Sequence, residues 1–193
     1  GVKRRFTKTG ICNGIVVIDD YAHHPVEIHA ALNAARLACN SGKVIVVFQP
    51  HRYTRLRDLF DEFCGCFEEA DIVFVSDVFA AGEIAIENFD RNHLVEGIRL
   101  LNYCQVLPLK NEEELPSQVA AVAEPGDLVL CLGAGNITTW ANSLPKDLED
   151  IFQAIGVTAT RKPIELTDSK STKQISDTRN SDVVVMEMED QTS

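Results

Sequence analysis

The chain has 193 residues, of which 45% are hydrophobic and 24% are charged, so it is long enough for one domain with a substantial core. Its formal net charge of −11 argues against nucleic acid or an anionic membrane surface as a general partner. No run of apolar residues is long enough to span a membrane. An anionic small molecule would therefore have to bind at a local cluster of basic residues.

Apolar, β-branched runs alternate with helical repeats along most of the chain. Strands are predicted at 14–19, 44–48, 71–76, 105–109 and 127–132. Helices are predicted at 25–40, 54–67, 91–101, 112–123 and 137–152. This alternation is typical of parallel strands joined by right-handed crossover helices. The predicted fold is therefore α/β and Rossmann-like, a doubly wound, mostly parallel sheet with helices on both faces.

The alternating pattern ends near Gly156. Residues 156–193 include the polar stretch TDSKSTKQISDTRNSD, which has no hydrophobic period. Such a composition buries too little apolar surface to offset the entropy of ordering the chain. The sequence thus predicts a folded domain over residues 1–155 and a disordered tail over 156–193. The six cysteines form no CxxC pair, and we interpret them as reduced thiols of a cytoplasmic protein.

A basic loop, QPHRYTR, follows the second predicted strand. Open parallel sheets bind ligands beyond the carboxyl ends of their strands, and this loop lies at such an end. It carries His51, Arg52 and Arg55 next to the start of a predicted helix. Guanidinium groups beside free helical N–H groups suit a carboxylate or a phosphate. The alternative is a solvated basic turn, and we favour the anion site.

The loop after the first predicted strand, within IDDYAHHPVEI, is rich in titratable groups. Adjacent histidines diverge and rarely bind one ion, and no HxH or HxxxE spacing is present, so no metal site is predicted. Asp20 could bind a ribose hydroxyl or a magnesium-bound phosphate, as acids just past a strand often do. The alternatives are that Asp20 caps a turn and that His24 stacks on Pro25.

Two further loops carry weaker signals. GAG at 133–135 contains only part of a dinucleotide fingerprint, since Thr138 stands in place of the third glycine, and a tight, closely packed turn is the favoured interpretation. Glu83 in AAGE is either a ligand contact or a polar loop tip. No GxxxxGK[ST] phosphate loop is present, so this chain cannot hold a triphosphate by that device.

Four motifs together resemble one known family. IDDYAHHPVEI, FQPHRYTR, DVFAAGE and LGAGNIT, in this order and spacing, are similar to the C-terminal domain of the Mur ligases over about residues 1–150. Members that join L-alanine to UDP-N-acetylmuramate match best. The resemblance implies ATP-dependent ligation through an acyl phosphate in cytoplasmic peptidoglycan synthesis. It also implies that ATP and magnesium are bound mainly by a central domain and the UDP-sugar by an N-terminal domain of the same enzyme.

The resemblance also implies roles for individual residues. Nucleotide contacts are implied for Arg5 and Asp20. Amino-acid substrate contacts are implied for Tyr21, His23, His51, Arg52 and Arg55. No catalytic residue of the family falls within this chain, which alone should be inactive, and Phe79 stands where the family usually has tyrosine.

Two other functions remain open at this point. One is a stand-alone module that binds a small anion or a nucleotide. The other is a metal-dependent hydrolase, against which the missing ligand spacings count.

Overall fold

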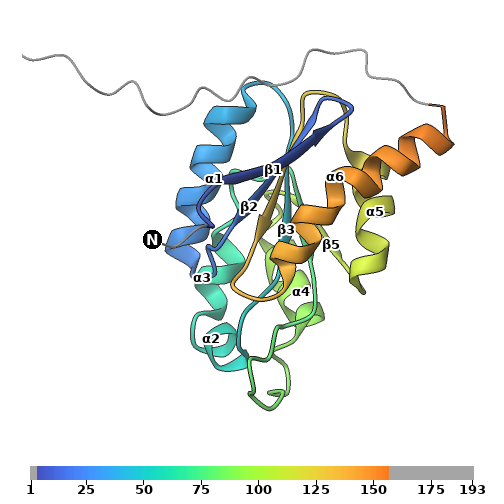
Figure 1. Ribbon diagram of the computed structural model, residues 1–193. Helices are drawn as coiled ribbons and strands as arrows, with labels where there is room; N and C mark the ends of the chain where they lie inside the picture. Colours follow the sequence, from blue (N-terminus) through green and yellow to red (C-terminus); the bar gives the residue numbers. More distant parts are fainter. Residues whose placement is uncertain (1–3, 157–193) are drawn as a thin grey trace, which may run out of the picture.

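The computed structural model describes residues 4–156. A six-stranded sheet forms the centre of the molecule, and helices lie on either side of it (Figure 1). The strands are β1 (Thr7–Cys12), β2 (Ile15–Asp20), β3 (Val44–Phe48), β4 (Ile72–Val75), β5 (Gln105–Pro108) and β6 (Leu128–Leu132). They are arranged in the order β1-β2-β6-β3-β4-β5, with β1 antiparallel to β2 and the other neighbours parallel. The predicted mostly parallel sheet is confirmed.

Helices cover both faces of the sheet. They are α1 (Pro25–Cys39), α2 (Tyr53–Asp58), α3 (Phe60–Gly65), α4 (Arg91–Leu101), the 3-10 turn η1 (Glu112–Glu114), α5 (Leu115–Val122) and α6 (Ile137–Ala154). Buried side chains of α1, α3 and α4 form one apolar core with the sheet, and those of α5 and α6 form the other. This arrangement confirms the doubly wound fold. None of the described helices combines the length and apolar character needed to cross a membrane.

The central strands are buried from end to end. Every residue of β3 and β6 is buried, because helices cover both sides of these strands. A strand covered on both faces needs apolar side chains at consecutive positions, which explains the runs VIVVF and LVLCL. The strands that give the strongest sequence signal are therefore those in the middle of the sheet.

Strand β1 was not predicted, because its sequence TKTGIC lacks an apolar run. It lies at the edge of the sheet, and only Cys12 is fully buried. Gly10 lets α6 approach, since a Cβ at that position would lie 2.7 Å from Cγ of Pro145. An exposed edge strand does not need the apolar pattern by which strands are recognised.

The single helix predicted over 54–67 is wrong. The chain leaves helical geometry at Leu59, with φ −125° and ψ 29°, and this residue separates α2 from α3. The predicted helix over 112–123 begins as the 3-10 turn η1, capped by Asn111, whose Oδ1 accepts from Glu114 N at 3.0 Å. The predicted tail lies outside the described residues except for Gly156.

Candidate functional site

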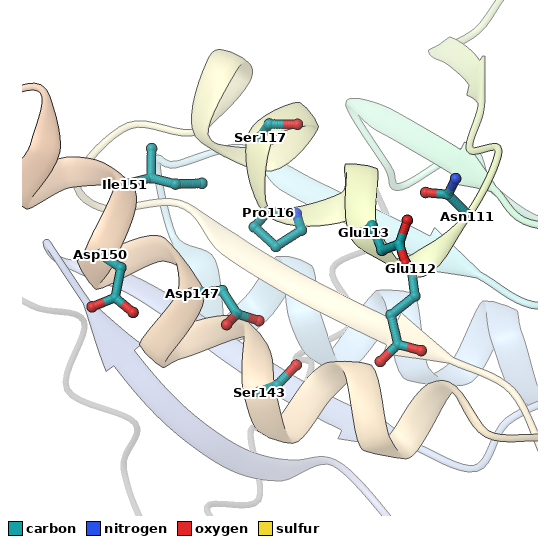
Figure 2. A pocket seen from close by; sticks show the side chains of 9 residues that line it. All are labelled: Asn111, Glu112, Glu113, Pro116, Ser117, Ser143, Asp147, Asp150 and Ile151. Atoms are coloured by element: carbon teal, nitrogen blue, oxygen red, sulfur yellow. The ribbon is translucent and has the colours of Figure 1, made fainter.

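One pocket of the molecule, on the α6 side of the sheet, contains none of the predicted site residues. That pocket, of about 640 Å³, lies between α6 and the η1–α5 segment (Figure 2), and carboxylates dominate its polar lining. It is lined by Asn111, Glu112, Glu113, Pro116, Ser117, Ser143, Asp147, Asp150 and Ile151. Within residues 4–156, no three His, Cys, Asp or Glu side chains are grouped as a metal site would require.

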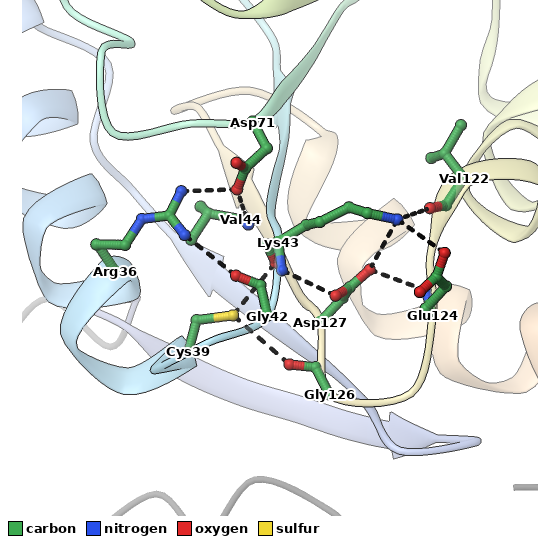
Figure 3. Close-up of polar contacts among 10 residues, drawn as sticks. All are labelled: Arg36, Cys39, Gly42, Lys43, Val44, Asp71, Val122, Glu124, Gly126 and Asp127. Carbon is green, nitrogen blue, oxygen red and sulfur yellow. Dashed lines mark hydrogen bonds and ion pairs between the residues drawn. The ribbon is translucent and has the colours of Figure 1, made fainter. Parts of the chain in front are cut away.

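At the edge of the sheet where the parallel strands begin, a network of mostly part-buried polar contacts joins the chain segments (Figure 3). Asp127, just before β6, accepts from the backbone N–H groups of Lys43 and Glu124, both at 2.8 Å. Asp71, just before β4, accepts from Val44 N at 2.7 Å and from Arg36 at 2.6 Å. These contacts connect the starts of β3, β4 and β6.

At the opposite edge of the sheet the loops after β2, β3 and β4 meet. The ring of His23 lies 5.0 Å from that of Tyr21 and 5.8 Å from that of His51, measured between centroids. The His51 ring stacks on Phe79 at 5.4 Å with an interplanar angle of 14°. Arg55 joins them through Nη1, which donates to the carbonyl oxygen of His51 at 2.9 Å. Residues from three loops that are far apart in the sequence thus form one cluster.

Arg52 has an unusual backbone conformation. Its φ is +75°, a region that non-glycine residues rarely adopt. The conformation is maintained by a hydrogen bond from Arg52 N to the carbonyl of Phe79 at 2.9 Å, and Phe79 N donates to Pro50 O at 2.8 Å. The Arg52 side chain is 49% exposed. The guanidinium is therefore accessible to a ligand while its backbone is fixed.

The surroundings of His51 favour a neutral imidazole. Burial lowers the pKa of His51 below its usual value, and the positive charge of Arg55 lowers it further. His23 and Arg52 act in the same direction, whereas Glu83 opposes them. Nδ1 of His51 lies 3.3 Å from Nη1 of Arg55 and can accept from it. In that tautomer Nε2 carries the proton and can donate to an anionic ligand.

Glu83 connects the loop after β4 to the start of α2. Its carboxylate accepts from the backbone N–H of Thr54 at 3.0 Å and from the Thr54 hydroxyl at 2.7 Å. These hydrogen bonds lower the pKa of Glu83, so the group is ionised near neutral pH. Glu83 is thus more than a polar loop tip, because it stabilises the first turn of α2.

Asp20 caps a turn, which was one of the interpretations left open. It is 8% exposed, and its oxygens accept from Phe6 N at 2.6 Å and from Ala22 N at 2.8 Å. Arg5 is exposed. Both residues line a pocket of about 360 Å³, which is otherwise largely apolar. Its other lining residues are Phe6, Tyr21, Ala22, Val26, Glu27, Ala30, Ala31 and Ala34.

Sequence reasoning missed Arg4. Its guanidinium pairs with the buried carboxylate of Asp19 through two hydrogen bonds of 3.0 and 3.1 Å and lies 5.2 Å from the centroid of the Tyr21 ring. Asp19 also accepts from the Thr138 hydroxyl at 2.6 Å. Thr138, which stands in place of the third glycine of a dinucleotide fingerprint, thus makes a structural hydrogen bond. The predicted strand 14–19 ends at Asp19, but nothing in the sequence showed that Asp19 is paired with an arginine or which of the adjacent arginines faces it.

The GAG turn permits close packing, as the sequence suggested. A Cβ at Gly135 would lie 2.7 Å from Cγ of Phe79 and would also collide with the Gln49 side chain. Gln49 donates to Asn136 Oδ1 at 2.7 Å and accepts from Ile137 N at 3.2 Å. These contacts join the loop after β6 to the loop after β3.

Comparisons with known proteins identify the family of the chain. Residues 4–135 match the family described as Mur ligase, glutamate ligase domain. The chain is 60% identical over 149 residues to the UDP-N-acetylmuramate--L-alanine ligase of Bradyrhizobium sp. (strain ORS 278), which covers 77% of this chain and 32% of that protein. It is 56% identical over 159 residues to the ligase of the same name from Rhodospirillum centenum, covering 82% and 33%.

A solved structure of a Mur ligase also matches this chain. The crystal structure of UDP-N-acetylmuramate-alanine ligase from Thermotoga maritima matches with a TM-score of 0.59 and 27% identity, over 80% of this chain and 31% of that chain. The chain thus spans about a third of the length of these relatives. Because the family match extends over more than half of its residues, the chain belongs to the Mur ligase family, of which it forms the glutamate ligase domain.

Proposed function

We propose that this chain is the C-terminal domain of an ATP-dependent ligase that joins L-alanine to UDP-N-acetylmuramate in the cytoplasm. The observation that carries the proposal is the convergence of His23, His51 and Arg52 at the carboxyl edge of the sheet. The similarity to L-alanine ligases over 77% of the chain supports it. Because no phosphate loop is present in this sequence, the N-terminal and central domains of the same enzyme are its partners, and the chain alone is inactive.

The cluster can receive the carboxylate of L-alanine. The half-exposed guanidinium of Arg52 offers paired N–H donors, and the neutral His51 offers Nε2–H. Arg55 helps to hold His51 in place, because its Nη1 contacts both the backbone carbonyl and the ring of His51. The rings of Tyr21 and His23 lie 5.0 Å apart beside this group, and they would contact the rest of the amino acid.

The pocket that contains Arg5 and Asp20 fits part of a nucleotide. Phe6 and Val26 give it apolar walls suited to a base, and Arg5 supplies a positive charge at the rim. Asp20 uses two acceptor positions on backbone N–H groups, and a carboxylate has about four in all, so it can still accept from a ribose hydroxyl. ATP with magnesium, held mainly by the central domain, would supply the phosphoryl group that activates the lactyl carboxylate.

A chimaeric enzyme tests the proposal. The last third of the Bradyrhizobium ligase is replaced by this chain, and release of ADP is measured with UDP-N-acetylmuramate, with and without L-alanine. We expect L-alanine-dependent release from the chimaera and none from the chain alone. A folded chimaera without this activity, combined with a chain that binds small carboxylates, would favour a stand-alone anion-binding module instead.

A further inference from the structure

The segment after β4, residues 76–83, fixes the backbone of the candidate amino-acid site. Phe79 N donates to Pro50 O, and Arg52 N donates to Phe79 O. Between these two hydrogen bonds, His51 and Phe79 form an isolated parallel bridge. Phe79, in the loop after β4, thus holds the loop after β3 in position.

The side chain of Phe79 also contacts the site. Its ring stacks on the His51 imidazole with centroids 5.4 Å apart. On another side it packs so closely against Gly135 that no side chain fits there. The Phe79 ring is therefore confined between the imidazole and the loop after β6, and it covers one face of His51.

Glu83 lies near the guanidinium of Arg52, in the loop after β3. Both of its carboxylate oxygens accept from Thr54, which fixes their orientation. Oε1 lies 3.8 Å from Nη1 of Arg52, which is beyond hydrogen-bonding distance. Glu83 therefore attracts the guanidinium without consuming its N–H groups, which stay available for the carboxylate of a ligand.

We propose that Phe79 and Glu83 are positioning residues of the amino-acid site. Phe79 fixes the plane of the His51 imidazole, and Glu83 holds the Arg52 guanidinium where the substrate carboxylate is received. The identity of that substrate rests on the proposed function, whereas the placement of the two side chains is a property of this chain. A side chain that is already ordered loses less conformational freedom on binding, so this positioning favours affinity.

The role of Glu83 is tested first in the chimaeric ligase. Glu83→Gln keeps the size of the side chain and an oxygen that can accept from Thr54, but it removes the charge. We expect the KM for L-alanine to rise about three- to tenfold, with kcat and the KM for ATP nearly unchanged. Glu87→Gln is the matched control, because Glu87 is an exposed acid on the same loop, and it should change none of these values.

The role of Phe79 is tested without any ligase activity. In the 193-residue chain, Phe79→Leu should raise the pKa of His51, because water then reaches the face of the imidazole that the ring had covered. Phe79→Tyr keeps the aromatic ring and should leave that pKa unchanged. Proton NMR titration of His51 measures both effects.

NMR relaxation of the Arg52 Nε–Hε group gives a second readout for Glu83 in the same chain. The order parameter should fall in Glu83→Gln and stay unchanged in Glu87→Gln. An unchanged His51 pKa in Phe79→Leu overturns the role of Phe79, and an unchanged Arg52 order parameter overturns that of Glu83. If both change as expected and the chimaera still lacks L-alanine-dependent activity, the positioning roles stand and the proposed substrate is wrong.

Discussion

Nη1 of Arg55 donates to the carbonyl oxygen of His51 at 2.9 Å and lies 3.3 Å from Nδ1 of the same residue. One guanidinium nitrogen therefore holds both the backbone and the ring of His51. The side chain of Arg52, in contrast, is half-exposed, and its Nη1 lies 3.8 Å from Oε1 of Glu83. The two arginines of the QPHRYTR motif thus have different surroundings, although the family resemblance implied amino-acid substrate contacts for both.

Substitution of Arg52 by lysine tests the carboxylate contact. Lysine keeps the charge but cannot form two parallel hydrogen bonds with one carboxylate. Loss of such a charge-assisted contact costs about 1.5–3 kcal/mol, so the KM for L-alanine in the chimaera should rise about ten- to a hundredfold. The KM for ATP should change much less. Equal changes in both constants would contradict a contact specific to the amino acid.

Substitution of Arg55 by lysine should also raise the KM for L-alanine, but by a different route. The lost hydrogen bond to the His51 carbonyl frees the loop, so the position of His51 should change. NMR of the 193-residue chain should therefore show shifted His51 signals in Arg55→Lys and nearly unchanged ones in Arg52→Lys. Unchanged His51 signals in Arg55→Lys would mean that Arg55 does not fix this histidine.

The stability of the chain should depend on pH through His51. Because its pKa is lowered in the folded state, the unfolded chain takes up a proton first as the pH falls below about 6.5. Stability from the neutral imidazole is thus present above that pH and is lost on acidification through the lowered pKa. Denaturant unfolding near neutral and mildly acidic pH should show a larger loss for the wild type than for His51→Gln. Equal losses would contradict a lowered pKa.

The difference between what the sequence predicted and what it missed has a physical cause. Strands β3 and β6 were predicted because burial on both faces demands apolar side chains at successive positions. Strand β1 was missed because an exposed edge strand makes no such demand. The break at Leu59 leaves the helical spacing of apolar residues unchanged on either side, so that spacing did not reveal it.

The candidate site likewise has some features that the sequence predicted and others that it missed. Motifs located His51 and Arg52 because they lie in the loop that follows a buried strand. The contact of Glu83 with Thr54 spans 29 residues and depends on the path of a long loop, so it could not be read from local sequence. The choice of Arg4 over Arg5 as the partner of Asp19 depends in the same way on the direction of one backbone turn.

The polar cluster at the opposite edge of the sheet should contribute to stability and not to binding. Asp127→Ala would leave the N–H groups of Lys43 and Glu124 without their acceptor in a partly buried region. We expect a loss of about 2–3 kcal/mol in the free energy of unfolding, measured with urea. Glu124→Gln is the control, because the Glu124 side chain is 66% exposed and forms only a surface ion pair, and it should cost less than about 1 kcal/mol. A similar loss in both variants would mean that the buried hydrogen bonds are not the cause.

Gly135 offers a test of the packing that joins three loops of the site. A Cβ at this position would lie 2.7 Å from Cγ of Phe79, so Gly135→Ala must displace the aromatic ring or the backbone beside it. Because Phe79 stacks on His51, the displacement should reach the imidazole, and the KM for L-alanine in the chimaera should rise. Gly65→Ala is the matched control, since nothing lies within 4 Å of a Cβ there, and it should leave the KM unchanged. If Gly135→Ala lowered the unfolding free energy and left the KM and the His51 signals as they are, the ring of Phe79 would not transmit packing at the β6 loop to the site.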